Sequence, residues 1–301
     1  MTDHDRPDLS VVVPSVNGWS DLERCLTALE KQRGDVFLEV LVVNRCGRDL
    51  REAARRQFPW IRLIDAEATT TIPDLRAMAF AEARADSVAV IEDHVLVPGG
   101  WARQMLAAQA RGEDVVGGTV YNAAVHRTVD WAAFLCEYSH LLPPLPNGPS
   151  HAITGNNTVY RRALLERFRH VTGAGRWEHH LHDALRAAGV TLYSRPEIKA
   201  AHKKHYTIAE YAGQRFLYAR SYAGARVEGA YLPKRFSYAL AGLALPPLLF
   251  YRIVSRVIGR RMHRAELLRS LPLLALFVCC WAAGEVIGYC LGPGNSLSKV
   301  R

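Results

Sequence analysis

The chain has 301 residues, of which 49% are hydrophobic and 22% are charged. This length and composition allow one large or two ordinary domains with a hydrophobic core, and they exclude a disordered, collagen-like or disulfide-knot protein. The net charge is +9, but residues 230–301 carry +8 of it, from ten basic and two acidic residues. That segment also holds the two longest apolar runs. The charge therefore favours an anionic membrane surface as the partner and argues against nucleic acid.

The six cysteines show no C-x-x-C spacing, so neither a zinc ribbon nor a disulfide framework is predicted. This cysteine usage favours a reducing, cytosolic environment for the body of the protein. The first eight residues have neither a basic region nor an apolar stretch, and no secretory signal is expected there. Membrane contact is expected from the C-terminal segment.

From residue 9 onward, short runs rich in β-branched residues alternate with stretches of helical periodicity. Ser20 and Glu23 form a predicted capping box, and Pro73 stands at the favourable first position of another helix. This alternation is typical of an α/β fold with a mostly parallel sheet flanked by helices, which binds ligands beyond the carboxyl ends of its strands. The predicted strands are 9–14, 37–43, 60–64 and 87–91, and the predicted helices begin near residue 20 and cover 49–57 and 73–84.

Polar turns follow three of these strands, at residues 14–17, 44–49 and 92–94. The third turn holds Glu92, Asp93 and His94, whose carboxylate oxygens and imidazole nitrogen can hold Mg²⁺ or Mn²⁺ beside a diphosphate. An ordinary solvated turn is the alternative for each of the three. Neither G-x-G-x-x-G nor G-x-x-x-x-G-K-[ST] occurs, so a Rossmann dinucleotide site and a P-loop are not supported.

The order of several motifs resembles the inverting glycosyltransferases of family 2, which have the GT-A fold. These motifs are 9–14, the turn after Val43, 90–94 followed by Pro98 and Trp101, and Gly155-Asn156-Asn157 followed by 160–162. The resemblance covers about residues 9–202. It implies transfer of a sugar, with inversion, from a nucleotide-diphosphate sugar to a glycan or lipid-linked acceptor, with Mn²⁺ or Mg²⁺ as cofactor.

In that family an Asp-x-Asp motif lies nine residues before a Trp, and this spacing places Glu92 and His94 on the two Asp positions. The resemblance implies that Glu92 and Asp93 contact the diphosphate and that Asp93, His94 and His202 bind the metal. A histidine in place of aspartate favours Mn²⁺ over Mg²⁺, or shifts coordination to Asp93. The same resemblance places Pro14, Asn17 and Asn44 in the nucleotide pocket, where the family usually has an acidic residue at position 44.

Counting back from Gly189, the resemblance aligns Glu178 with the acid that acts as catalytic base on the acceptor hydroxyl. A glutamate stabilised by the helix dipole, with no catalytic role, is the alternative. His179, His180 and His182 crowd the same turn, but their spacing does not match H-E-x-x-H. We expect these histidines to line an acceptor cleft or to face solvent.

The predicted boundary lies between a GT-A domain, 1–229, and a membrane-associated helical region, 230–301. Residues 271–291 are long and apolar enough to span a bilayer. Residues 236–258 contain two adjacent prolines and are expected to be interfacial, re-entrant or transmembrane. The Arg-rich linker between the two runs favours a cytoplasmic catalytic domain. A two-span hairpin and a buried helical hairpin of a soluble domain are the alternatives.

Two other functions remain open from the residues alone. A non-catalytic nucleotide-sugar-binding module is suggested by the departures at Asn44 and His94. A nucleotidyltransferase would share the α/β architecture, but it needs a Gly-rich basic loop after the first strand, which residues 14–18 lack.

Overall fold

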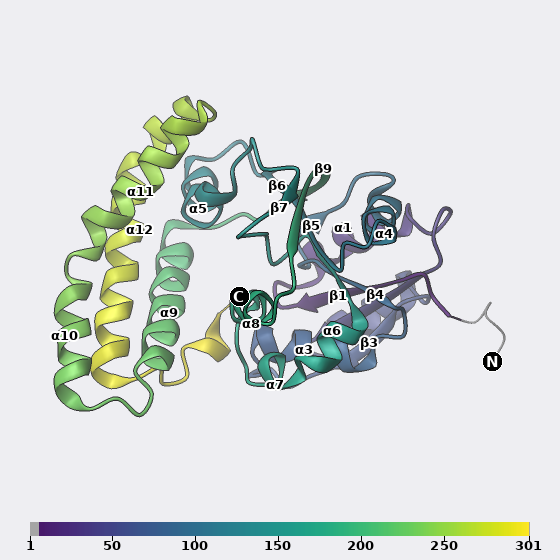
Figure 1. Cartoon of the computed structure of the whole chain (residues 1–301), viewed down its shortest axis with the longest axis horizontal. Helices are drawn as coiled ribbons and strands as arrows, with labels where there is room; N and C mark the ends of the chain where they lie inside the picture. The colour runs from purple at the N-terminus through teal and green to yellow at the C-terminus, as the bar shows by residue number, and fades with distance from the viewer. Residues whose placement is uncertain (1–5, 301) are drawn as a thin grey trace. The chain divides into compact units, whose positions relative to one another are not determined.

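The computed structural model describes residues 6–300, and the chain divides into two compact units (Figure 1). Unit 1 holds residues 6–121 and 143–203, and unit 2 holds residues 122–142 and 204–300. The second unit therefore begins before the predicted boundary at residue 229, and it includes one segment from the middle of the chain. The reason is that the helix at Ile208–Arg226 packs on the long apolar helix near the C-terminus.

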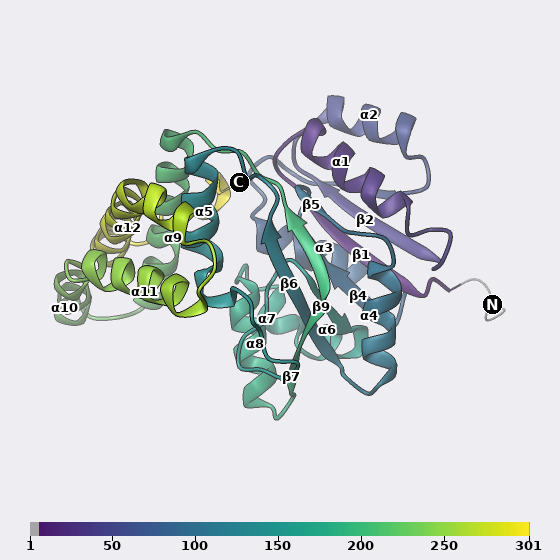
Figure 2. The same ribbon diagram turned by 90° about the horizontal axis from the view of Figure 1, so that it is seen from above.

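Unit 1 is built on a mixed sheet with the strand order β3-β2-β1-β4-β8-β6-β9-β5, in which β7 pairs with β9 (Figure 2). The first four of these strands are parallel to one another, whereas β8 is antiparallel to both β4 and β6. The strands are β1 (Leu9–Ser15), β2 (Leu38–Asn44), β3 (Arg62–Asp65), β4 (Ser87–Val90), β5 (Val95–Leu96), β6 (Val115–Asn122), β7 (Gly148–Pro149), β8 (Thr158–Arg161) and β9 (Leu192–His202).

The predicted α/β fold is confirmed, and so are the four predicted N-terminal strands. The central strands are buried on both faces because each carries an unbroken apolar run. In β1, Val11 and Val13 belong to one buried cluster and Val12 belongs to the other. Such two-sided burial is what parallel strands covered by helices require.

Helices cover both faces of this sheet. The helices of unit 1 are α1 (Trp19–Glu30), α2 (Arg48–Gln57), α3 (Ile72–Glu82), α4 (Trp101–Ala110), α6 (Arg162–Arg167), α7 (Arg169–Thr172) and α8 (Glu178–Ala187). Prediction of α2 and α3 is confirmed, including the proline in the first turn of α3.

The predicted capping box at the start of α1 is wrong. Helix α1 begins at Trp19, with Gly18 as its N-cap and no side-chain cap bond, so Ser20 lies inside the helix. Gly18 has φ 98°, a backbone conformation that glycine adopts at little cost and serine does not. A capping box does occur in α9, where Thr207 and Glu210 bond each other's backbone N–H groups.

Unit 2 is helical. It consists of α5 (Thr128–Tyr138), η2 (Ser139–Leu141), α9 (Ile208–Arg226), α10 (Leu232–Gly242), α11 (Leu245–Arg260), α12 (Arg264–Leu291) and η3 (Leu297–Lys299). The predicted break in the first apolar run lies between α10 and α11, which bend by 50°. The two prolines at 246 and 247 then occupy the first turn of α11, where the missing N–H groups cost nothing.

By length and apolarity, α12 is the one helix within residues 6–300 that qualifies alone as a membrane span. The bent pair of α10 and α11 qualifies only if both helices are taken together.

Candidate active site

Strand register brings two histidines together that are far apart in the sequence. His94 ends the turn after β4, directly before β5, and His202 is the last residue of β9. In the antiparallel pair of β5 and β9, Val95 lies opposite His202. The N–H of Lys203 also donates to the carbonyl of His94, which closes the ladder at this point. The two imidazoles therefore meet at the edge of the sheet where the predicted site lies.

The two imidazoles present nitrogen atoms to each other. Nε2 of His94 lies 3.0 Å from Nε2 of His202, and the two rings are perpendicular. A carboxylate oxygen of Asp93 lies 3.0 Å from Nδ1 of His94, which favours a proton on that nitrogen. In the neutral imidazole, Nε2 of His94 then carries the lone pair and points to the place that His202 also faces. This is the arrangement of a metal-binding histidine oriented by a carboxylate.

Asp93 lies behind His94. Its carboxylate is fully buried and accepts hydrogen bonds from the backbone N–H groups of Val16 and Asn17 and from the side-chain amide of Asn17. Burial raises the pKa of Asp93, but the bonds from His94, Asn17 and Val16 outweigh it and leave the pKa below its usual value. Asp93 is thus an ionised group whose oxygens are already engaged, while Asn17 ties the turn after β1 to the turn after β4.

Glu92 completes a group of three possible ligands. One ligand atom from each of Glu92, His94 and His202 lies within 4.8 Å of the other two. The side-chain amide of Asn156 donates to Oε2 of Glu92 at 2.8 Å, and the buried guanidinium of Arg76 lies 3.2 Å from Oε1. Two imidazole nitrogens and one carboxylate suit a transition ion such as Mn²⁺, with positions left for phosphate oxygens. The residues present fit the predicted divalent metal.

Arg76 also reaches the predicted base. Its Nη1 lies 2.5 Å from Oε2 of Glu178, the first residue of α8, so one guanidinium joins Glu178 to Glu92. Burial raises the pKa of Glu178, but the charge of Arg76 and a hydrogen bond from the residue's own backbone N–H lower it more, and the net pKa lies below the usual value. Glu178 is therefore ionised at neutral pH.

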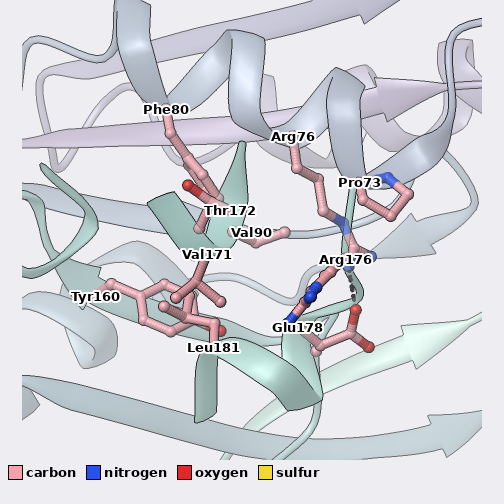
Figure 3. A pocket seen from close by; sticks show the side chains of 11 residues that line it. Pro73, Arg76, Phe80, Val90, Tyr160, Val171, Thr172, Arg176, Glu178 and Leu181 are labelled. Carbon is pink, nitrogen blue, oxygen red and sulfur yellow. Dashed lines mark hydrogen bonds and ion pairs between the residues drawn. The ribbon is translucent and has the colours of Figure 1, made fainter. Parts of the chain in front are cut away.

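A pocket opens beside Glu178 (Figure 3). Its cavity volume is small, about 20 Å³, and it lies between α3, α7, α8 and the strands β4 and β8. Figure 3 shows the ion pair of Arg76 and Glu178 at one side, with Phe80, Val171 and Leu181 lining the interior. The pocket is mostly apolar, with a carboxylate and two guanidinium groups, those of Arg76 and Arg176, at its edge.

The motif Gly155-Asn156-Asn157 does three different things. Gly155 lies against the carboxylate of Glu178, and Asn156 donates to Glu92. Asn157 is fully buried and links three elements of the core, since its amide accepts from Trp101 Nε1 and donates to the carbonyls of Thr119 and Ile198. The first two residues of the motif therefore contact the carboxylates of the site, and the third holds core elements of the sheet together.

The predicted nucleotide residues lie at the carboxyl ends of β1 and β2. Pro14 is paired with Val43 inside the sheet. Asn44 is almost fully buried, donates to the carbonyl of Gly47 and accepts from the N–H of Cys46. Its amide thus shapes the turn after β2, and it lies 3.3 Å from the carboxylate of Asp65 at the end of β3.

The histidines at the start of α8 separate into two groups. His182 is buried and bonds the hydroxyl of Tyr160 at 2.7 Å, so for this residue the expectation of a cleft-lining or solvent-facing side chain is wrong. Helical geometry turns its side chain into the apolar core on which α8 packs. His179 and His180 lie on the more accessible side, with ring centroids 4.1 Å apart.

The comparison with protein families decides what kind of fold carries this site. The profile of glycosyl transferase family 2 matches residues 10–169. The chain belongs to glycosyl transferase family 2. This match includes the turn 92–94 and the Gly-Asn-Asn motif, but it ends before Glu178 and His202. A search of curated protein sequences gave no match.

Solved structures of glycosyltransferases share the fold of this family 2 chain. The mannosyltransferase PcManGT from Pyrobaculum calidifontis, in complex with GDP-Man and Mn²⁺, is 17% identical, with 93% of this chain and 87% of that chain covered and a TM-score of 0.56. GalNAc-T7 with UDP, GalNAc and Mn²⁺ is 14% identical, with 67% and 45% covered and a TM-score of 0.50. At these identities the likeness shows the GT-A fold.

Sequence reasoning missed Arg76 and the separate tasks of the Gly-Asn-Asn motif. Arg76 lies in α3 between the buried residues Leu75 and Ala79, and its side chain is 6% exposed. An arginine at that place in a helix has no distinguishing sequence pattern. Its role follows only from the two carboxylates, Glu92 and Glu178, that the fold brings to it.

Proposed function

We propose that this chain transfers a sugar, with inversion, from a nucleotide-diphosphate sugar to an acceptor hydroxyl in a metal-dependent reaction. The observation that carries the proposal is the convergence of Glu92, His94 and His202, whose ligand atoms lie within 4.8 Å of one another, and its link through Arg76 to Glu178. Arg76 thus contacts both Glu92, at the proposed site of the metal and diphosphate, and Glu178, the carboxylate suited to act as base.

Glu178 is the proposed catalytic base. It accepts the proton of the acceptor hydroxyl while the acceptor oxygen bonds to the anomeric carbon, and the bond from that carbon to the diphosphate oxygen breaks with its electrons leaving on the diphosphate. The lowered pKa of Glu178 keeps the carboxylate ionised before the reaction. Arg76 holds the carboxylate through Oε2, and Oε1 lies against Gly155.

Glu92, His94 and His202 are the residues proposed to hold Mn²⁺ or Mg²⁺, and Asp93 is proposed to support the ion through His94. When bound, a divalent ion supplies Lewis-acid stabilisation of the charge that develops on the departing diphosphate. Two imidazole ligands favour Mn²⁺ over Mg²⁺. The Mn²⁺ and nucleotide ligands of the two structural relatives support this part of the proposal.

The nucleotide is proposed to lie at the carboxyl ends of β1 and β2, near Pro14, Asn17 and Asn44. Since the side-chain amides of Asn17 and Asn44 already bond the protein, the backbone of these turns is proposed to contact the base. The acceptor is proposed to be a glycan or lipid-linked molecule that enters at the pocket beside Glu178. We further propose a membrane location with the catalytic unit in the cytoplasm, which the basic apolar C-terminal region supports.

The test of the base is Glu178→Gln. Transfer is expected to fall by roughly 10²- to 10⁴-fold, while the affinity for the nucleotide-sugar donor stays within a factor of two or so. Glu166→Gln is the matched control, because Glu166 is an exposed glutamate of the same unit that pairs with Arg162 in α6. Unchanged transfer by Glu178→Gln refutes the base assignment. A screen of nucleoside diphosphates and nucleotide sugars with Mn²⁺ by thermal shift identifies the donor first.

The test of the metal site uses His94→Ala and His202→Ala. Each variant is expected to lose most of its Mn²⁺ affinity in a titration followed by electron paramagnetic resonance, because each removes one of three ligands. Donor binding with intact Mn²⁺ affinity but no transfer by the wild-type chain supports the alternative, a non-catalytic nucleotide-sugar-binding module.

A further inference from the structure

A row of exposed apolar side chains runs along α10 and α11 in unit 2. Leu232, Phe236, Leu240, Leu243 and Tyr251 are each at least 61% exposed. The spacing of four residues places Leu232, Phe236 and Leu240 along one side of α10, whereas Leu243 lies at the junction of the two helices and Tyr251 lies in α11. The row runs over residues 232–251 and crosses the 50° bend between α10 and α11. A contiguous apolar surface of this length on a folded protein marks a binding surface.

Helix α12 has a free apolar side of its own. After Arg269, its exposed residues before the C-terminal end are apolar or weakly polar, and Pro272, Leu276, Cys279 and Ala283 among them recur at helical spacing. We call this set the free strip of α12. Figure 1 shows α10 and α12 running alongside each other, and both α10 and α11 pack on α12. The free strip and the apolar row therefore belong to one helical layer.

A different face of α12 is closed by α9, which packs at very short range. A Cβ added at Gly284 would lie 2.3 Å from the carbonyl oxygen of Phe216, and one added at Gly288 would lie 2.5 Å from that of Arg220. Small residues let two helix backbones approach in this way. The two helices are thus closely packed along the C-terminal half of α12.

Helix α9 carries charged residues that lie beside the middle and the end of α12. The guanidinium of Arg215 stacks over the ring of Trp281 at 4.0 Å, and Arg220 donates to the carbonyl of Gly292. The N-terminal half of α12 packs on α5, whose Asp130 is buried and accepts from the N–H of Tyr206. Each half of α12 therefore packs on a helix that contains charged residues: α5 on the N-terminal half and α9 on the C-terminal half.

The turn between α11 and α12 is strongly basic. Arg252, Arg256, Arg261, Arg264 and Arg269 lie on it or within three turns of it, and no ion pair of theirs is found within residues 6–300. Burial and the neighbouring charge of Arg252 lower the pKa of Arg256, so the two cations oppose each other. An anionic surface removes this repulsion, because each basic residue near anionic lipid gains about 1 kcal/mol, a factor of roughly five in affinity.

We propose that unit 2 is an in-plane membrane anchor: α10, α11 and α12 lie in the interface of an anionic bilayer, with the apolar row and the free strip in the acyl region, the arginines on lipid phosphates, and α5 and α9 on the aqueous side. This inference concerns unit 2 alone and does not rest on the proposed transfer reaction.

The packing of α12 is what favours this orientation over a transmembrane one. A transmembrane α12 would carry Arg215 of α9, which stacks on Trp281 near the middle of α12, to the depth of the hydrocarbon, where a charged side chain is costly. The bend of 50° between α10 and α11 also prevents that pair from crossing as one straight helix. Helices lying in the plane keep α9 and its arginines out of the hydrocarbon and still bury the apolar row.

Vesicle flotation of the full chain tests the surface. We expect binding to phosphatidylcholine vesicles that contain phosphatidylglycerol, and roughly ten- to thirtyfold weaker binding for Arg252→Gln/Arg256→Gln. Phe236→Ser/Leu240→Ser/Leu243→Ser is expected to weaken binding more than about tenfold. The matched controls are Arg55→Gln/Arg56→Gln, two exposed arginines of α2, and Phe37→Ser, an exposed phenylalanine of unit 1. These controls should bind like wild type, and equal loss in controls and test variants overturns the proposal.

Cysteine labelling in sealed vesicles tests the orientation. Met262→Cys and Asn295→Cys lie just outside the two ends of α12, and both residues are exposed. In a background with serine at Cys46, Cys279 and Cys290, an impermeant maleimide added from one side should label both positions or neither. Labelling of the two from opposite sides shows that α12 spans the bilayer and overturns the in-plane arrangement. Failure to bind vesicles, with a dimer in sedimentation that the serine variants abolish, assigns the apolar row to a second copy instead and also overturns it.

Discussion

The carboxylate of Glu178 rests on the backbone of Gly155, with Oε1 only 2.2 Å from where a Cβ at residue 155 would stand. Real Cβ atoms do not approach an oxygen that closely, so only glycine leaves room for the carboxylate in this position. The Gly-Asn-Asn motif thereby limits where the proposed base can lie. Arg76 limits it from the other side, through its ion pair with Oε2.

Gly155→Ala is therefore expected to displace Glu178 and to lower kcat by roughly 10- to 100-fold, with little change in donor affinity. Steady-state kinetics with separate determination of kcat and KM checks this. Gly34→Ala is the control, because a Cβ at Gly34 meets nothing within 4 Å. A Gly155→Ala enzyme with unchanged kcat shows that the position of Glu178 does not matter to the reaction.

The two adjacent asparagines should respond differently to alanine. Asn157→Ala removes three buried hydrogen bonds, including the one from Trp101, and is expected to lower the free energy of unfolding by about 2–4 kcal/mol. Asn156→Ala removes one bond to Glu92 and is expected to change Mn²⁺ affinity with a much smaller loss of stability. Urea unfolding and Mn²⁺ titration of both variants check this, and equal stability losses speak against the division of roles.

Asp93→Asn should weaken the metal site without removing any of its three proposed ligands. The amide cannot accept from Val16, Asn17 and His94 together as the carboxylate does, so the imidazole of His94 loses its fixed tautomer. We expect Mn²⁺ affinity to fall by roughly 10- to 100-fold. Asp183→Asn, an exposed aspartate of α8, serves as the control. Wild-type Mn²⁺ affinity in a folded Asp93→Asn variant contradicts the proposed role.

The buried contact of His182 with Tyr160 makes stability depend on pH. Burial lowers the pKa of His182 from the usual 6.5 to about 4. Between these values the unfolded chain binds the proton and the folded chain does not, so stability falls as pH drops, by about 3 kcal/mol over the whole window. Denaturant unfolding across this range checks the slope. His182→Gln is expected to be less stable at neutral pH and less dependent on pH, and a parallel pH profile for both chains contradicts it.

The strands and helices of the N-terminal half could be predicted because the sequence patterns that indicate them are local. The strands β1, β2 and β4 each contain an apolar run, and Pro73 marks the start of α3 through a constraint on its own backbone. The incorrect prediction of a cap at Ser20 also rests on a local pattern. A capping box is a pattern of side chains, and the neighbouring Gly18, with positive φ, provides the helix start without one.

The members of the site were partly predictable and its arrangement was not. Glu92, Asp93 and His94 follow a buried strand, and a polar turn at such a place is visible in the sequence. That Asp93 faces away from the ligand group and His94 faces His202 depends on the antiparallel register of β5 and β9, which pairs residues more than a hundred positions apart in the chain.

By itself the sequence determined that this protein has an α/β body with acidic and imidazole groups at a strand end, and a basic, apolar C-terminal region. Periodicity, composition and motif order are properties of the sequence itself, so they can be recognised without knowledge of the fold. Only the tertiary structure decided that Arg76 joins Glu92 to Glu178, that Gly155 makes room for the base, and that α9 closes one side of α12. Those relationships are contacts between segments that are distant in the sequence. The burial of each residue, and the charged groups that lie next to it, are decided only when the chain packs.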